Sequence, residues 1–277
     1  MPSPEPIARL IGVRKAFGSL RVLGDDDGGL NLDLAKGQTT VIIGPSGTGK
    51  SVLLKHLVGL LRPDSGEVWF EGQRIDTLGE AELVESRTKM GFLFQMGALF
   101  DSMTVAQNIM FPLVQHTELS AAERTERCEK MLALVGLSGI ESKMPAELSG
   151  GQRKRVALAR AVVLEPDLVL YDEPTTGLDP IRSDVINELI VALRERLGVT
   201  GVVVTHDMAS ARKIADRIVM LHEGRFIADG DPASFDRTDN ELVQRFVRGE
   251  AEPEELALIR AAGDSQGLNT EAQRHGD

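Results

Sequence analysis

The stretch Gly44-Pro45-Ser46-Gly47-Thr48-Gly49-Lys50-Ser51 decides the fold, because it has the spacing G-x-x-x-x-G-K-[ST]. The β-branched run Val41–Ile43 precedes it and predicts a strand, while a helical pattern begins near Lys50. In this context the glycines let backbone N–H groups point inward, and the helix N-terminus adds positive potential. Lys50 can then reach the β- and γ-phosphates of a nucleotide, and the Ser51 hydroxyl can hold Mg²⁺. The alternative is a glycine-rich turn, which the strand–helix context disfavours.

Other runs extend this strand–loop–helix unit into a sheet. Three short runs are apolar on both faces, which predicts central strands of a parallel sheet covered by helices: Leu168–Tyr171, Val202–Thr205 and Ile218–Leu221. Residues 181–197 place apolar side chains on one face at helical spacing. This alternation predicts an α/β layer fold. Residues 96–165 lack a convincing strand and predict a helical insertion in the α/β core.

Composition narrows the class of protein. The chain has 277 residues, a formal net charge of −11 and one cysteine, Cys128. No apolar run approaches the roughly 18 residues that span a bilayer, and the N-terminal M-P-S-P-E-P does not resemble an export signal. The acidic balance argues against nucleic-acid binding, and the five histidines show no metal-ligand spacing. These features predict a cytoplasmic protein.

Two acidic residues follow the predicted strand 168–171. Because successive side chains at a strand end point to opposite sides, Asp172 can reach Mg²⁺ while Glu173 addresses a nucleophilic water. A carboxylate in that position suits the catalytic base of phosphoryl transfer to water. The alternative is a surface acid pair that caps a strand. His206 follows the predicted strand 202–205 and can sense the γ-phosphate there, although a lone histidine at a strand end is usually structural.

A second potential anion site lies within the helical insertion. Ser149 is a natural N-cap, and Gly150 and Gly151, followed by Gln152, expose backbone N–H groups at the start of a helix that extends through Ala161. One nucleotide has no obvious use for two such sites. The pattern therefore suggests a second phosphate or a second subunit, and the alternative is a simple helix cap.

Together these motifs resemble the ATPases of ATP-binding cassette (ABC) transporters. The resemblance covers roughly residues 7–245 and includes Gln95 and G-L-D at Gly177–Asp179, with every motif in the family's order. It implies a P-loop NTPase (RecA-like) core with an antiparallel β-subdomain and an inserted α-helical signature subdomain. The implied ATPase domain is 7–249, with core parts at about 7–95 and 166–249, a helical subdomain at about 96–165 and an acidic tail at 250–277.

The same resemblance implies roles for residues. ATP and Mg²⁺ are the implied cofactors, and two ATP molecules would lie between two head-to-tail copies of the chain. Phe17 resembles the aromatic that stacks on adenine, and the alternative is a core phenylalanine. Asp179 would sit at the seam between the two sites. The implied catalytic residues are Glu173, His206, Gln95 and Lys50. The implied Mg²⁺ ligands are Ser51, Gln95 and Asp172. The implied nucleotide contacts are Phe17, Gly44, Pro45, Ser46, Gly47, Thr48, Gly49, Lys50 and Ser51, with Ser149, Gly150, Gly151, Gln152 and Asp179.

The apolar residues that follow Gln95 suggest a partner. A groove of methionine and aromatic side chains suits a short helix, which in this family is the coupling helix of a membrane permease. The predicted lining residues are Met96, Ala98, Leu99, Phe100, Met103 and Val105. Ordinary packing within the subdomain is the alternative for each of them.

Two segments point to a sub-family. G-A-L-F-D-S-M-T-V at 97–105 and F-P-L-V-Q-H-T-E-L-S at 111–120 are similar to ATPases of the Mla/MCE type, which serve phospholipid transport. This similarity implies a permease dimer, a periplasmic MCE-domain protein and a small STAS-domain partner. It also implies a peripheral location on the cytoplasmic face of the bacterial inner membrane. The alternatives are an importer ATPase for polar solutes such as amino acids and, in a different class, a soluble ABC protein acting on ribosomes or DNA.

Two regions depart from the family pattern or lie outside it. The acidic segment 24–29 stands where such ATPases run directly into a strand, so the start of the β-subdomain stays open. The tail contains a helical candidate at 253–262, for which disorder and partner docking are both possible.

Overall fold

The sheet that carries the phosphate loop is largely parallel. The computed structural model describes residues 6–26 and 28–251, which form two units divided after Pro232. In the first unit, six described strands pair in the order β11-β10-β4-β9-β8-β7. They are β4 (Thr39–Ile43), β7 (Met90–Leu93), β8 (Leu168–Asp172), β9 (Thr200–Val204), β10 (Arg217–His222) and β11 (Arg225–Gly230). All neighbours are parallel except β11, which runs antiparallel to β10. The predicted α/β fold is confirmed, and β4, β8 and β9 are buried at every position.

A second sheet is antiparallel, as the family resemblance implied. Its strands are β1 (Ala8–Phe17), β2 (Leu20–Leu23), β3 (Leu30–Leu34), β5 (Ser65–Phe70) and β6 (Gln73–Arg74). They pair in the order β2-β1-β5-β6, with β3 also on β1. The acidic segment forms the β2–β3 connection: the N–H of Asp25 donates to the carbonyl of Gly28, and the N–H of Gly28 donates to Asp25 Oδ1, both at 2.9 Å. This turn delays the start of β3 to Leu30.

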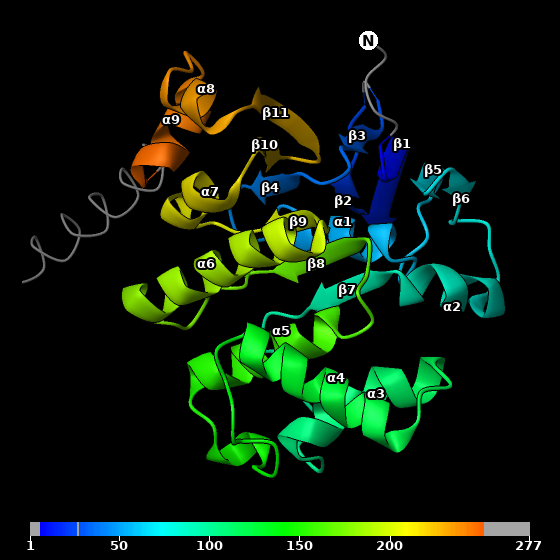
Figure 1. Cartoon of the computed structure of the whole chain (residues 1–277). Helices are drawn as coiled ribbons and strands as arrows, with labels where there is room; N and C mark the ends of the chain where they lie inside the picture. Colours follow the sequence, from blue (N-terminus) through cyan, green and yellow to red (C-terminus); the bar gives the residue numbers. More distant parts are fainter. Residues whose placement is uncertain (1–5, 27, 252–277) are drawn as a thin grey trace, which may run out of the picture. The chain divides into compact units, whose positions relative to one another are not determined.

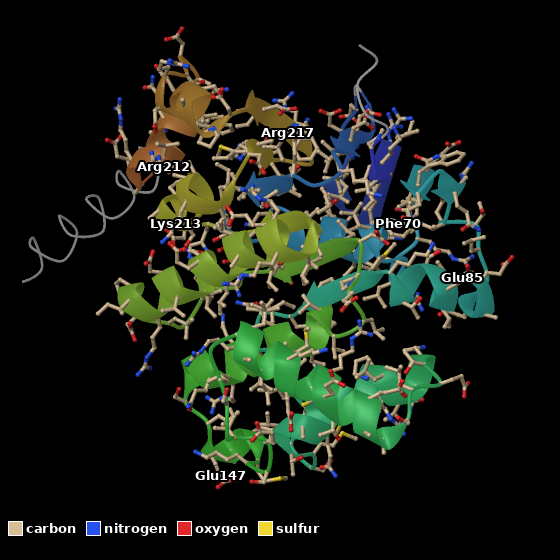
Figure 2. All side chains as sticks on the ribbon, in the orientation of Figure 1. Phe70, Glu85, Glu147, Arg212, Lys213 and Arg217 are labelled. Atoms are coloured by element: carbon tan, nitrogen blue, oxygen red, sulfur yellow. The ribbon has the colours of Figure 1, made fainter. Side chains whose placement is uncertain are left out.

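Four helices of the first unit outside the helical insertion pack on the sheets. They are α1 (Lys50–Leu57), α2 (Glu80–Thr88), α6 (Pro180–Leu197) and α7 (Met208–Ile214). α1 contacts β8 and β9 of the parallel sheet and β5 of the antiparallel sheet, so both sheets share one core. Phe70, labelled in Figure 2, is one of the buried residues of that core. The strong end signals of α6 explain its length: Asp179 caps it, Pro180 is its first residue and Gly198 ends it with φ +68°.

The predicted helical insertion lies between β7 and β8 in the chain. It contains α3 (Val105–His116), α4 (Ala121–Leu134), a 3₁₀ turn (Pro145–Glu147) and α5 (Gly150–Val162), and residues 96–165 form no strand. Thr104, Ser120 and Ser149 each cap the helix that follows them and form a capping box. α5 packs against α3 and β7, which joins the insertion to the edge of the parallel sheet (Figure 1).

The second unit contains the last described helices. α8 (Pro232–Asp236) spans the division, and α9 (Glu241–Arg248) begins after the Asn240 cap and ends at Gly249 with φ +68°. The helical candidate at 253–262 lies outside the described residues. None of the described helices combines the length and the apolar character needed to cross a bilayer.

Candidate active site

The phosphate loop runs from the end of β4 into the first turn of α1, and two of its glycines are required by geometry. Gly44 has φ +148°, and a Cβ there would lie 2.2 Å from the carbonyl oxygen of Leu221. Gly49, which caps α1, has φ +95°, and a Cβ there would lie 2.6 Å from Val22 Cγ1. The loop therefore passes closer to β10 and β2 than a residue with a side chain could.

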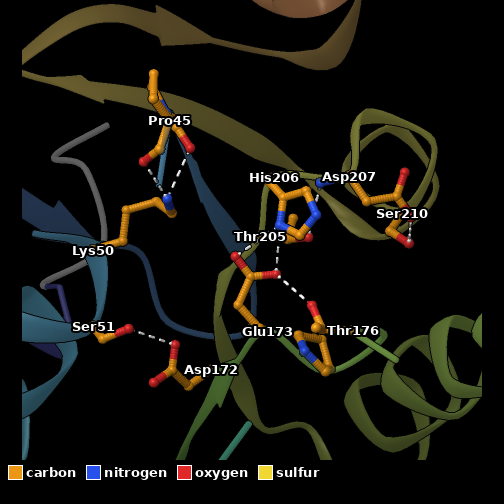
Figure 3. Close-up of polar contacts among 12 residues, drawn as sticks. Pro45, Lys50, Ser51, Asp172, Glu173, Thr176, Thr205, His206, Asp207 and Ser210 are labelled. Carbon is orange, nitrogen blue, oxygen red and sulfur yellow. Dashed lines mark hydrogen bonds and ion pairs between the residues drawn. The ribbon is translucent and has the colours of Figure 1, made fainter. Parts of the chain in front are cut away.

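The side chain of Lys50 turns into this loop. It is 6% exposed, and its Nζ donates to the carbonyl oxygens of Gly44 and Pro45, both at 2.8 Å (Figure 3). Burial lowers the pKa of Lys50, while the nearby carboxylates of Glu173 and Asp172 act in the opposite direction. A buried ammonium group among backbone carbonyls is a cation with strong donors, as phosphate binding requires.

Ser51 and Asp172 meet beside this lysine. The Ser51 hydroxyl donates to Asp172 Oδ1 at 2.8 Å, although the two residues come from α1 and β8 (Figure 3). Asp172 is 9% exposed; burial raises its carboxyl pKa, and the hydrogen bond from Ser51 opposes this rise. In the described part of the chain, no three His, Cys, Asp or Glu side chains gather to hold a metal ion. The hydroxyl–carboxylate pair nevertheless fits Mg²⁺, which prefers one or two carboxylates supplemented by phosphate oxygens and water.

Glu173 contacts two other side chains at the same sheet edge. His206 Nδ1 lies 3.1 Å from Oε1 and 3.0 Å from Oε2, and the Thr176 hydroxyl donates to Oε2 at 3.0 Å (Figure 3). His206 Nδ1 therefore lies within hydrogen-bond distance of both oxygens of the Glu173 carboxylate. The structure thus brings Lys50, Ser51, Asp172, Glu173 and His206 to the carboxyl ends of β4, β8 and β9. We call these five residues the catalytic edge.

Two other predicted residues have a more open environment. Phe17 ends β1 and is 47% exposed, with Lys15 Nζ 5.6 Å from its ring centroid. The alternative that Phe17 belongs to the core is therefore wrong. Gln95 follows β7, is exposed and makes no hydrogen bond to the described residues. The adenine contact of Phe17 and the Mg²⁺ contact of Gln95 stay predictions.

The turn at residues 149–152, which we call the signature turn, lies beside the G-L-D segment at 177–179. The Ser149 hydroxyl accepts from the N–H of Gln152 at 3.3 Å, and Gln152 Oε1 accepts from the N–H of Ser149 at 3.0 Å. A Cβ on Gly151 would lie 3.5 Å from Cδ of Arg182, whose Nε pairs with Asp179 Oδ2 at 3.2 Å. The sequence did not predict this adjacency.

Sequence reasoning missed two residues that touch Glu173. One is Thr176, whose contact depends on the turn after β8. The other is Lys154 of α5, whose Nζ donates to the backbone carbonyls of Pro174 at 2.7 Å and Glu173 at 3.2 Å. The available signal for Lys154 was a basic residue on the buried side of an otherwise apolar helix face.

A groove of about 650 Å³ lies where the helical insertion meets β7 and α2. We call it the docking groove. Arg160 lies over the ring of Phe100, at 5.7 Å from its centroid, and the rings of Phe100 and Phe111 are 5.0 Å apart. Its lining residues are Val84, Arg87, Thr88, Met90, Gly91, Phe92, Phe94, Ala98, Phe100, Phe111, Pro112, His116, Arg160, Ala161 and Leu164.

The predicted groove residues agree only in part with this lining. Ala98 and Phe100 line the docking groove. The prediction for Val105 is wrong, because Val105 is the first residue of α3 and is fully buried in the helical insertion. Met96 is 88% exposed but lies outside the lining, as do Leu99 and Met103.

The fold and the site together define a class of protein. The parallel sheet has a glycine–lysine–serine loop after one strand and a carboxylate pair after another. This arrangement is typical of the nucleotide site of P-loop nucleoside triphosphatases. The chain belongs to the ABC transporter family, whose model matches residues 28–176, and it is an ATP-binding ATPase of that family, as the sequence predicted.

Individual relatives support this assignment. The chain is 42% identical over 238 residues to "Probable ribonucleotide transport ATP-binding protein mkl" of Mycobacterium leprae, covering 86% of this chain and 67% of the relative. It spans about two thirds of the length of the mycobacterial relatives. It is 43% identical over 232 residues to "Intermembrane phospholipid transport system ATP-binding protein MlaF" of Haemophilus influenzae, covering 84% and 87%. The solved dimeric ATP-binding cassette MJ0796 bound to ADP and Pi superimposes with a TM-score of 0.74 at 34% identity, covering 81% and 98%.

Proposed function

We propose that this chain is the ATP-hydrolysing subunit of an Mla/MCE-type ABC transporter and powers phospholipid transport through a partner permease. The lipid assignment rests on one observation: the match to MlaF, named for intermembrane phospholipid transport, extends over 87% of that relative at 43% identity. The segments at 97–105 and 111–120 that resemble this sub-family also contribute Ala98, Phe100, Phe111, Pro112 and His116 to the docking groove.

In this proposal two copies bind two ATP molecules head to tail. The dimeric state of MJ0796 with ADP and Pi supports such an arrangement. The phosphate loop of one copy would hold the triphosphate, with Phe17 against the adenine. The signature turn 149–152 of the other copy would complete the site, since its N–H groups lie at a capped helix start. Asp179 would lie at the seam between the two sites.

The catalytic edge supplies the proposed chemistry. Glu173 would polarise the attacking water, and His206 would hold Glu173 and contact the γ-phosphate, for which their 3.0–3.1 Å contact is the support. Lys50 would bind the β- and γ-phosphates. Mg²⁺, when held by Ser51, Asp172 and Gln95, supplies neutralisation of phosphate charge.

The docking groove would receive the permease. Its exposed rings suit the apolar face of a short helix. The chain would then lie on the cytoplasmic face of the bacterial inner membrane, beside a permease dimer. A periplasmic MCE-domain protein and a small STAS-domain protein complete the proposed assembly.

A second candidate is the ATPase of a transporter for polar solutes. The mycobacterial relatives, named for ribonucleotide transport, favour it at 42% identity over 238 residues. The groove and the catalytic edge would act in the same way, and only the permease and its cargo would differ.

Purification of the chain with its permease, reconstituted in phospholipid vesicles, tests these proposals. We expect Glu173→Gln to keep ATP binding, to trap the dimer and to lower turnover by about 10²- to 10³-fold. Glu195→Gln on the exposed side of α6 is a matched control that should keep full turnover. Phospholipid bound to the purified permease supports the first candidate. Turnover that responds to ribonucleotides or amino acids, with no bound lipid, would replace it by the second.

A further inference from the structure

Lys154 is a buried cation whose side chain bonds to backbone carbonyls. Its residue is 7% exposed, although lysine is rarely buried unless it is paired. Within the described chain it forms no ion pair, and its Nζ donates instead to two successive backbone carbonyls, Pro174 O at 2.7 Å and Glu173 O at 3.2 Å. Burial lowers the pKa of Lys154 to about 8, and the charge of Glu173 opposes this change. Such a costly group calls for an explanation beyond packing.

The two carbonyls belong to a strained turn. Glu173 has φ +50°, a left-handed conformation that a residue with a side chain adopts only when its surroundings hold it there. On one side its N–H donates to the carbonyl of Val204 in β9 at 2.9 Å, and on the other its carbonyl accepts from the N–H of Thr176 at 3.3 Å. Lys154 adds a charged donor from a separate element, α5. The peptide of Glu173 is therefore held from β9 and from the helical insertion.

The position of Lys154 on α5 connects this turn to the signature. α5 begins at Gly150 after the Ser149 cap, and Lys154 lies four residues further along. Four residues correspond to about 6 Å of helix, so the cap and the lysine belong to the same rigid first turns. A movement of the start of α5 must therefore displace the donor that holds Glu173.

We infer that Lys154 is a positioning residue for hydrolysis: it holds the backbone of Glu173, and so the aim of the carboxylate, from the helix that starts with the signature turn. The inference rests on the proposed role of Glu173 as the base. In the proposed dimer it gives each copy an internal link. A phosphate bound at the signature turn of one copy acts on α5, and α5 acts through Lys154 on the Glu173 of that same copy, which serves the other ATP.

Lys154→Met tests this link, because methionine fills a similar volume and has no donor. In the reconstituted complex with its permease, we expect kcat for ATP to fall by about tenfold or more, since small misplacement of a catalytic group is enough for such a loss. We expect KM and the dissociation constant for ATP to stay within about threefold, since the lysine touches no predicted nucleotide contact. Lys154→Gln, which keeps N–H donors without the charge, should lose less of kcat than Lys154→Met.

Arg155 offers a matched control on the same helix. Its Nη1 donates to the backbone carbonyls of Val135 at 3.3 Å and Gly136 at 3.2 Å, away from Glu173. Arg155→Met therefore removes a comparable tether, and its kcat should stay within about twofold, since both of its acceptors, the carbonyls of Val135 and Gly136, lie away from Glu173. A kcat for folded Lys154→Met equal to that of Arg155→Met would overturn the inference.

A parallel measurement on Glu173→Gln distinguishes failure of the positioning role of Lys154 from failure of the proposed role of Glu173 as the base. A large loss of kcat in Glu173→Gln with none in the Lys154 variants rejects the positioning role and leaves the proposed base in place. Full activity in Glu173→Gln rejects the base and, with it, the role inferred for Lys154. If Lys154→Met does not fold, the comparison of Lys154→Ala with Arg155→Ala decides the question in the same way, because each change removes the donor.

Discussion

At the catalytic edge, each of the five side chains is hydrogen-bonded to another part of the chain, whereas the docking groove leaves large apolar side chains exposed. Lys50 bonds to the loop carbonyls, Ser51 to Asp172, and Glu173 to His206. In the groove, Phe94 is 39% exposed and Phe100 is 42% exposed. The contrast suggests a division of work. A group that performs chemistry must be held in place before its ligand arrives, while a docking surface keeps its contacts for the partner.

The largest effect should come from Lys50→Ala, which breaks the catalytic edge and leaves the groove intact. We expect ATP turnover to fall by about 10²- to 10³-fold, because the variant loses the cation that meets the phosphates. Titration with a fluorescent ATP analogue should show a matching loss of affinity, and the permease should still co-purify. Lys36→Ala, at an exposed position before β4, is the matched control. Normal turnover in Lys50→Ala would contradict the phosphate-binding role.

Phe100→Asp should produce the opposite pattern. A charge among the rings of the docking groove, which a bound permease would cover, should lower permease co-purification by more than about tenfold, as for a central interface anchor. ATP binding by the chain alone should not change. Met96→Asp is the informative comparison, because Met96 is 88% exposed yet lies outside the groove lining. Loss of the permease in Met96→Asp but not in Phe100→Asp would place the docking surface outside the groove, at the exposed residue Met96.

The partial agreement between the predicted and observed groove residues shows which features the sequence predicts and which it does not. The strands β4, β8, β9 and β10 were predictable, because each is apolar on both faces. β7 is only four residues long and contains Gly91, so it gave a weaker signal. The antiparallel sheet was expected from the family resemblance alone. Val105 shows the limit most clearly: it follows the helix cap Thr104, and only the packing of α3 decides that it is buried.

The catalytic edge was easier to predict, since its residues fall within short motifs. Lys50, Ser51, Asp172 and Glu173 are fixed by spacing and by the strand ends. Their partners were not predictable in the same way. The contact of Lys154 with the Glu173 carbonyl joins α5 to the turn after β8, in which Glu173 adopts φ +50°. No local sequence pattern predicts that a glutamate adopts a left-handed backbone conformation.

Phe17→Ala tests whether the exposed ring of Phe17 serves nucleotide binding or permease docking. Phe17 is 47% exposed, as a docking residue would be, but it is predicted to stack on adenine. Loss of base stacking should raise KM for ATP by about tenfold, with kcat nearly unchanged, because stacking on an aromatic contributes about 1–3 kcal/mol. Phe17→Tyr should restore KM. An unchanged KM together with weaker permease binding would instead group Phe17 with the docking groove.

Thr176→Val should have the smallest effect on turnover. It tests whether the Thr176 hydroxyl is needed to hold the Glu173 carboxylate in place. The change removes one hydroxyl that donates to Glu173 Oε2 at 3.0 Å and leaves the contact with His206. We expect kcat to fall by about three- to tenfold at constant KM, because the bond orients the carboxylate without touching the nucleotide. Thr125→Val, whose hydroxyl bonds within α4, is the matched control. A higher KM with normal kcat would show that Thr176 serves binding. Normal values for both would mean that His206 and the backbone of the turn hold Glu173 without its help.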